Sequence, residues 1–151
     1  MGRAVAWLTA AMVVVTVVVV GLRYGLATSS IFLQESVMYM HGAVLMLGIS
    51  YALKENRHVR VDIFYARMSE RRQALVDVTG HLLFLLPVSL LIFWTSLPYV
   101  ANAWRVLEGS SEVGGVPAVF LLKTLIPIMA LLLGLQGLNE IVRGVQRLRQ
   151  R

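Results

Sequence analysis

Four long apolar stretches constrain the fold of this chain more than any other feature of its sequence. They cover residues 4–22, 31–53, 74–100 and 116–142. A helix that crosses the roughly 30 Å hydrocarbon core of a bilayer needs about 20 mainly apolar residues, and each stretch reaches that length. Because 58% of the 151 residues are hydrophobic and only 15% are charged, too little polar surface remains for a water-soluble fold. We therefore predict a single all-α membrane domain with four transmembrane helices.

The first stretch is longer than the hydrophobic region of a signal peptide. Residues 4–22 carry no charge, whereas signal peptides have apolar regions of about 7–15 residues. Arg3 before the stretch, and the small residues Gly25 and Ala27 after it, match the flanks of a signal peptide. The length nevertheless favours a helix that is retained in the membrane.

The basic residues are distributed unevenly among the connections. Eleven of the 14 Lys and Arg residues lie at the N-terminus, in the connection 54–72 or in the C-terminal tail. Lys and Arg in short loops mark the cytoplasmic side of a membrane, and four crossings place all three regions on one side. We therefore predict a topology with both termini in the cytoplasm (N-in, C-in). This orientation accounts for the net charge of +6, so a nucleic-acid partner is not needed to explain it.

The basic connection between the second and third stretches has an amphipathic pattern. Asp62 is a plausible N-cap, after which Phe64, Tyr65 and Met68 fall on one helical face and Arg67 on another. The segment 63–68 is predicted either as a short amphipathic cytoplasmic helix at the interface or as the beginning of the third span. The pattern leaves both interpretations open.

Ionisable residues inside membrane spans are rare and are functional candidates by default. Glu35, with its neighbour Gln34, falls in the first turns of the second span, where we expect a solvated or paired acid or a contact with a partner subunit. Lys123 lies near the outer end of the fourth span, and its long side chain is expected to snorkel to the interface. Glu140 and Arg143 are spaced for an ion pair on one helical face.

Two histidines raise the questions of proton transfer and haem. Asp77 and His81 are one helical turn apart, and we favour a structural hydrogen bond to a neighbouring helix over a proton relay. His41 and His81 could suggest a bis-histidine haem. The helical rise places them about 18 Å and about 10 Å from the cytoplasmic ends of their spans, and these different depths argue against a shared haem.

Small residues and prolines indicate packing and bending of the spans. Ala130 with Gly134, and Gly21 with Gly25, would allow close approach of neighbouring helices. Prolines inside the third and fourth spans can bend helices and free backbone carbonyls; they are Pro87, Pro98 and Pro127.

The sequence has no pattern of a catalytic or cofactor site. It contains no cysteine and no HExxH, GxSxG or P-loop motif. No acid lies at the centre of a span, where a solitary carrier would need one to couple an ion to its substrate. We therefore expect no catalytic, substrate-binding, cofactor or metal site in this chain, and we expect it to act with a larger partner.

The sequence resembles the small permease subunit of tripartite ATP-independent periplasmic (TRAP) transporters, the DctQ-like family. The resemblance covers about residues 5–143. The segments that carry it are Gln34-Glu35-Ser36, Tyr51-Ala52-Leu53-Lys54, His58-Val59-Arg60-Val61-Asp62, Ser69-Glu70-Arg71-Arg72, Gly115-Val116-Pro117 and Leu132-Leu133-Gly134-Leu135-Gln136-Gly137.

The resemblance implies a membrane scaffold without a substrate site of its own, in the bacterial inner membrane. Its partners would be a large permease subunit, which would carry the sodium and organic-acid sites, and a periplasmic substrate-binding protein. The predicted contact residues toward these partners are Gln34, Glu35, His58, Arg60, Asp62, Glu108, Glu112 and Lys123. A haem-binding redox anchor and an autonomous small carrier are the alternatives. The identity of the substrate lies in other chains.

Overall fold

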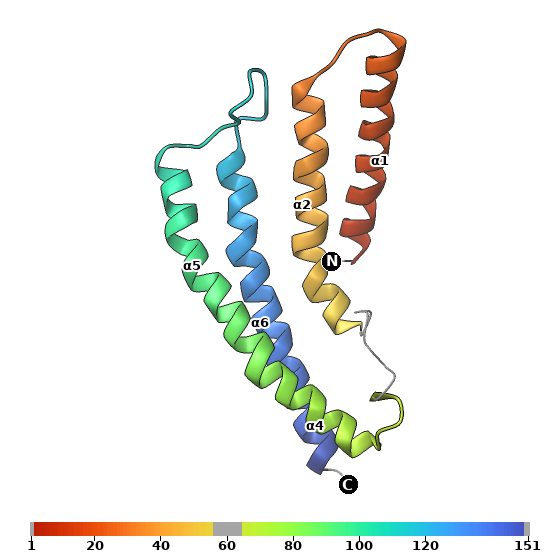
Figure 1. Ribbon diagram of the computed structural model, residues 1–151, viewed down its shortest axis with the longest axis vertical. Helices are drawn as coiled ribbons and strands as arrows, with labels where there is room; N and C mark the ends of the chain where they lie inside the picture. The colour runs from red at the N-terminus through yellow and green to blue at the C-terminus, as the bar shows by residue number, and fades with distance from the viewer. Residues whose placement is uncertain (1, 56–64, 150–151) are drawn as a thin grey trace.

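The computed structural model describes residues 2–55 and 65–149 (Figure 1), and every regular element within these two ranges is helical. In chain order the elements are α1 (Gly2–Gly25), α2 (Ile31–Lys54), α4 (Glu70–Gly80), the π-helical turn η1 (His81–Leu85), α5 (Leu86–Arg105) and α6 (Val119–Arg149). Ser30 caps α2, because its hydroxyl accepts a hydrogen bond from the backbone N–H of Leu33.

The predicted fold class is confirmed, because four helices of the described chain are long and apolar enough to cross a membrane. The second lies within one residue of its predicted range. The third is a continuous rod of α4, η1 and α5 over Glu70–Arg105, and it begins four residues earlier and ends five residues later than predicted. The fourth spans Val119–Arg149 and runs seven residues beyond its predicted end. The orientation in the membrane stays a prediction.

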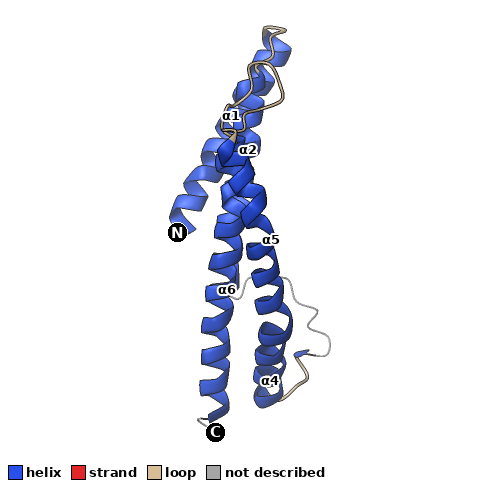
Figure 2. Cartoon of the chain, turned by 90° about the vertical axis from the view of Figure 1, so that its left-hand side faces the viewer, coloured by secondary structure: helices blue, strands red, loops and turns tan. Residues whose placement is uncertain are grey.

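The helices form an open layer in which α6 holds a central place. α1 packs on α2, α2 packs on α6, and the other side of α6 packs on the α4–η1–α5 rod. Figure 2 shows the same arrangement turned by 90°. The few buried apolar residues of the described chain lie at these helix contacts; they are Leu53, Ala74, Val100, Ala103 and Ala130. Most large apolar side chains therefore point outward, as expected where lipid is the solvent.

Small residues on α6 let the rod approach closely, as predicted for Ala130 and Gly134. Ala130 is 2% exposed, and a Cβ at Gly134 would lie 3.2 Å from the hydroxyl of Ser89. The same side of α6 continues to Gly144, where a Cβ would collide with a methyl group of Val78. Gly21 and Gly25 make no such contact within the described chain, since a Cβ at either position would meet nothing within 4 Å.

Pro87 explains the π-helical turn in the rod. A proline has no N–H, and its ring clashes with the carbonyl four residues earlier. The chain relieves this conflict by widening, so that the N–H of Leu86 bonds the carbonyl of His81 five residues back. Of the three prolines predicted to disturb the helices, Pro87 follows this π-helical turn at His81–Leu85, whereas Pro98 and Pro127 lie inside the continuous helices α5 and α6.

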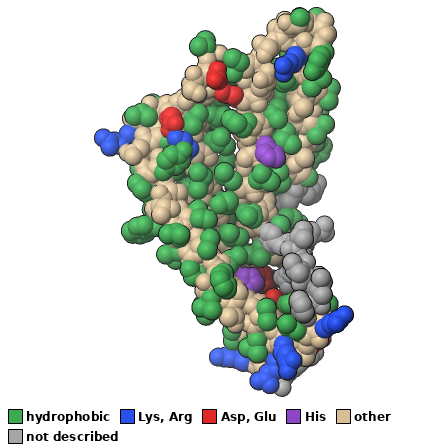
Figure 3. Space-filling view, viewed as in Figure 1, with side chains coloured by type: hydrophobic (Ala, Val, Ile, Leu, Met, Phe, Trp, Pro, Cys, Tyr) green, Lys and Arg blue, Asp and Glu red, His purple; other side chains and the backbone are tan. Residues whose placement is uncertain are grey.

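The two ends of the layer differ in chemistry. The loop end carries the connections 26–30 and 106–118, and the basic end carries the arginines of α4 and of the last turns of α6. Figure 1 shows α4 and the end of α6 reaching past the end of α2, and Figure 3 shows blue side chains gathered there. The first two residues of the predicted amphipathic helix 63–68 lie outside the described residues. Its described part ends in a turn, where the N–H of Met68 bonds the carbonyl of Tyr65 at 3.1 Å.

Candidate functional site

The loop end brings together five of the eight predicted contact residues. They come from the first turns of α2, from the connection 106–118 and from the first turns of α6; they are Gln34, Glu35, Glu108, Glu112 and Lys123. The other three, His58, Arg60 and Asp62, lie outside the described residues. The loop end is therefore the candidate site that the structure describes.

Glu35 fastens the connection 106–118 to α2. One carboxylate oxygen accepts a hydrogen bond from the hydroxyl of Ser110. The other accepts one from the backbone N–H of Val116 at 2.6 Å. Hydrogen bonds to an ionised acceptor are stronger than neutral ones, so these three residues, which we call the Glu35 latch, restrain the loop at two points. The expectation of a paired acid is confirmed, and its partners belong to this chain.

The loop closes around the latch through its own backbone. The N–H of Ser110 bonds the carbonyl of Val116 at 3.2 Å, and the N–H of Glu112 bonds the Ser110 hydroxyl at 3.0 Å. Gly114 has a φ of +79°, a conformation that glycine adopts without steric cost. A Cβ at Gly115 would lie 2.7 Å from the Glu35 carboxylate and would also collide with Ser110. Two glycines thus meet two different requirements of the same turn.

Lys123 pairs with Glu108 within the chain. Its ammonium donates to both carboxylate oxygens of Glu108, at 2.7 and 2.5 Å, and lies 4.2 Å from the ring centroid of Tyr99. The Lys123 and Glu108 side chains are only 16% and 36% exposed. The long lysine side chain was expected to snorkel to the interface. Its ammonium reaches a carboxylate of the connection 106–118 and an aromatic face, which together stabilise a cation in a partly desolvated place.

Glu112 remains the outward-facing acid of the described loop. Its side chain is exposed and forms no ion pair in the part of the chain that the structure describes. A cavity of about 330 Å³ lies beside it, lined also by Ile31, Gln34, Glu35 and Met38. The amide of Gln34 donates to the hydroxyl of Ser29 at 3.1 Å. The cavity therefore has an apolar floor of Ile31 and Met38, with the polar side chains of Gln34, Glu35 and Glu112 beside it.

The sequence could not indicate several residues that build this end. Ser110 and Val116 are neutral loop residues, and only their distance in space from Glu35 reveals their role. Trp104 is a further residue of this end, near the end of α5. Its indole N–H donates to Thr124 at 2.9 Å, and its ring meets that of Phe120 edge to face at 4.7 Å, so it also joins the end of α5 to α6.

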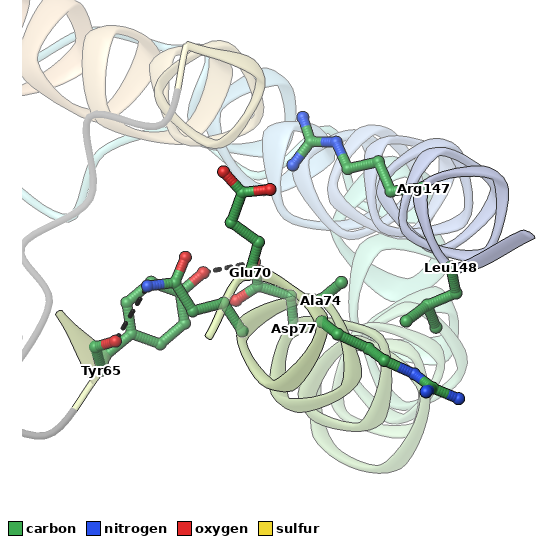
Figure 4. A pocket seen from close by; sticks show the side chains of 8 residues that line it. Tyr65, Glu70, Ala74, Asp77, Arg147 and Leu148 are labelled. Carbon is green, nitrogen blue, oxygen red and sulfur yellow. Dashed lines mark hydrogen bonds between the residues drawn. The ribbon is translucent and has the colours of Figure 1, made fainter. Parts of the chain in front are cut away.

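A polar cavity of about 550 Å³ lies at the basic end between α4 and α6 (Figure 4). Arg71 and Arg147 line it together with the acids Glu70 and Asp77, so charges of both signs face it. The hydroxyl of Tyr65 donates to the Asp77 carboxylate at 2.7 Å. This bond ties the end of the basic connection to the rod.

The other predicted polar pairs have mixed outcomes. His81 bonds through Nδ1 to the backbone carbonyl of Asp77, within the same helix. A carbonyl can only accept, so Nδ1 carries the proton. The contact is a structural hydrogen bond, as predicted. Its partner, however, lies in the same rod and not on a neighbouring helix. The predicted pair of Glu140 and Arg143 is confirmed at 3.2 Å. Among the described residues, no group of three or more His, Cys, Asp or Glu could hold a metal ion.

The fold and the loop end define a multi-pass helical membrane protein whose polar groups bind one another or face outward. A family model matches residues 12–147, which is most of the chain: Tripartite ATP-independent periplasmic transporters, DctQ component. The chain therefore belongs to the DctQ family, the small subunits of TRAP transporters, which are transporter components and not enzymes. No curated protein and no solved structure was found to match it.

Proposed function

We propose that this chain is the static scaffold subunit of a sodium-driven importer of an organic acid. The observation that carries the proposal is the family match over residues 12–147. The system to which the family belongs has three parts, which implies a large permease subunit and a substrate-binding protein as partners. Substrate and sodium would bind in the large subunit, and this chain would need no cofactor.

The arrangement of charge supports an inner-membrane orientation with the basic end in the cytoplasm. The last turn of α6 carries Arg147 and Arg149, and the first turns of α4 carry Arg71 and Arg72. Positively charged segments are retained on the cytoplasmic side. The loop end would then face the periplasm, where the substrate-binding protein would dock.

The Glu35 latch supports a docking role for the loop end. A loop that is held before binding loses less conformational entropy when its partner arrives. Glu108 is occupied by Lys123 and Glu35 by the latch, so Glu112 is the acid best placed to meet a basic group of the substrate-binding protein.

Uptake by reconstituted vesicles tests the scaffold role. Vesicles that hold the large subunit with this chain, plus the binding protein and a sodium gradient, should accumulate the organic acid. Vesicles that lack this chain should not, although the large subunit is present in the same amount. Accumulation by this chain alone would refute the scaffold role and favour an autonomous carrier.

A further inference from the structure

One face of α2 presents a row of exposed side chains along the membrane span. Gln34, Met38, His41 and Leu45 are all exposed and recur at intervals of four, three and four residues, which places them on a single helical face. We call this row the α2 ridge. Its upper part borders the cavity that Gln34 and Met38 line together with Glu112.

His41 makes a lipid environment for the α2 ridge unfavourable. It is the eleventh of the 24 residues of α2, so the helical rise places it about 15 Å from the loop end of the helix and about 20 Å from the other. That depth is close to the middle of a hydrocarbon core of about 30 Å. Ionisable side chains inside membranes almost always face protein or water. Yet His41 is exposed and makes no side-chain hydrogen bond within residues 2–55 and 65–149.

The opposite face of α2 has a different character. There, Tyr39, Met40 and Ala43 line a groove of about 290 Å³ together with Leu8 of α1 and with leucines of α6. Its walls are almost entirely apolar, which suits lipid chains. The two faces of the same helix thus contrast in polarity at the same depth.

We infer that the α2 ridge is the surface that packs against the large permease subunit, an inference that rests on the proposed function. The partner surface would be apolar opposite Met38 and Leu45 and would offer a hydrogen-bonding group at the depth of His41. Figure 3 shows a histidine on the visible face of α2, with acidic side chains nearer the loop end. The ridge therefore offers the partner two polar side chains that can fix its position along α2: Gln34 at the loop end and His41 near the middle of the membrane.

A second copy of this chain fits the ridge less well. Two copies with the same membrane orientation are related by an axis along the membrane normal, so a symmetric contact through the ridge pairs like ends. The loop end beside the ridge carries Glu35 and Glu112, and each acid would approach its own counterpart. Like charges placed opposite one another disfavour association.

Photo-crosslinking in the assembled complex tests the inference. A benzophenone amino acid replaces Met38 or Leu45 on the ridge, and Leu121 serves as the control. Leu121 is 50% exposed and lines the opposite groove. It lies at the depth of the ridge, because a Cβ at Gly42 would touch the neighbouring Leu122 at 3.0 Å. The ridge positions should give an adduct with the large subunit, and position 121 should give none.

The outcomes separate the inference from the proposed function. A large subunit that co-purifies with the wild-type chain but crosslinks only from position 121 overturns the inference and leaves the proposed function intact. Adducts of two small subunits from the ridge would overturn it in favour of a homodimer. If no complex with the large subunit forms at all, the proposed function fails and the inference fails with it.

A substitution series tests the hydrogen bond of His41 separately. His41→Leu should weaken association with the large subunit roughly threefold, the typical weight of an interhelical hydrogen bond in a bilayer. His41→Gln keeps a donor and an acceptor and should recover part of that loss. Equal retention of the large subunit by the wild type and both variants would show that His41 has no polar partner there.

Discussion

Removal of the Glu35 carboxylate should release the connection 106–118 without unfolding the helices. The acid accepts one hydrogen bond from the Ser110 hydroxyl and one from the Val116 N–H. A hydrogen bond to a charged group contributes about 1.5–3 kcal/mol. Glu35 is only partly buried, so water replaces part of what is lost and the lower value applies to each bond. Glu35→Ala should therefore lower the local opening free energy of the loop by about 3 kcal/mol.

Hydrogen exchange of the Val116 amide measures this change directly. In nanodiscs, Glu35→Ala should speed that exchange roughly 150-fold, the equivalent of about 3 kcal/mol. Glu35→Gln keeps one acceptor oxygen and loses the charge, so an increase of roughly tenfold is expected. Amides in the middle of α2 should exchange at the wild-type rate, because the helix keeps its own hydrogen bonds.

Glu112→Ala is the matched control for the loss of a negative charge. Glu112 lies in the same loop, but its side chain is exposed and only its backbone takes part in the turn. Exchange at Val116 should hardly change in this variant. If the two alanine variants exchange equally fast, or if neither differs from the wild type, then the carboxylate of Glu35 does not hold the loop.

Three further predictions concern glycines of the loop end, of α6 and of α1, and the acid Glu112. Gly115→Ala should open the same loop, because its Cβ would collide with the Glu35 latch, whereas Gly114→Ala meets open space and should cost only about 1–2 kcal/mol for its positive φ. Hydrogen exchange of the loop amides compares the two variants, and faster exchange in Gly114→Ala than in Gly115→Ala would contradict the geometry. Gly144→Ala should lower the melting temperature in detergent, because its Cβ would collide with the stiff Val78 side chain. Gly21→Ala meets open space and should leave the melting temperature unchanged or raise it. Equal melting temperatures of the two variants would count against close packing at Gly144. Glu112→Arg should weaken docking of the substrate-binding protein, as measured by the concentration that gives half-maximal uptake, with the melting temperature unchanged; unaltered docking would remove Glu112 from the interface.

The four-helix architecture could be predicted from the sequence because it depends on one property, the length of apolar runs. Each run must exceed the thickness of the hydrocarbon core, and this requirement leaves little freedom. The ends of the helices were harder to predict. The rod begins at Glu70 and α6 continues to Arg149, through polar residues that hydropathy assigns to loops. Helices there continue because α4 and α6 pack on each other beyond the end of α2.

The loop-end contacts depend on distances that no local pattern encodes. Glu35 and Val116 are 81 residues apart in the chain, and Lys123 meets Glu108 only because the connection 106–118 turns back over the start of α6. Their residue types marked them as candidates, since charged groups near the membrane need partners. Whether the partner would be water, another subunit or this chain could not be decided without the fold.

The open layer itself has a physical explanation that links fold to function. Lipid tails are as apolar as leucine, so no hydrophobic force closes four helices into a compact bundle. Helices associate closely only where small residues let their backbones approach. In this chain those residues lie on α6 and hold the rod, as Ala130 and Gly134 do. α2 is covered by α1 and α6 at its sides and keeps a face with His41 exposed. A layer of this kind is stable in lipid but leaves the His41 side chain without a polar neighbour on that face of the described chain. A larger membrane partner that covers the face would supply one.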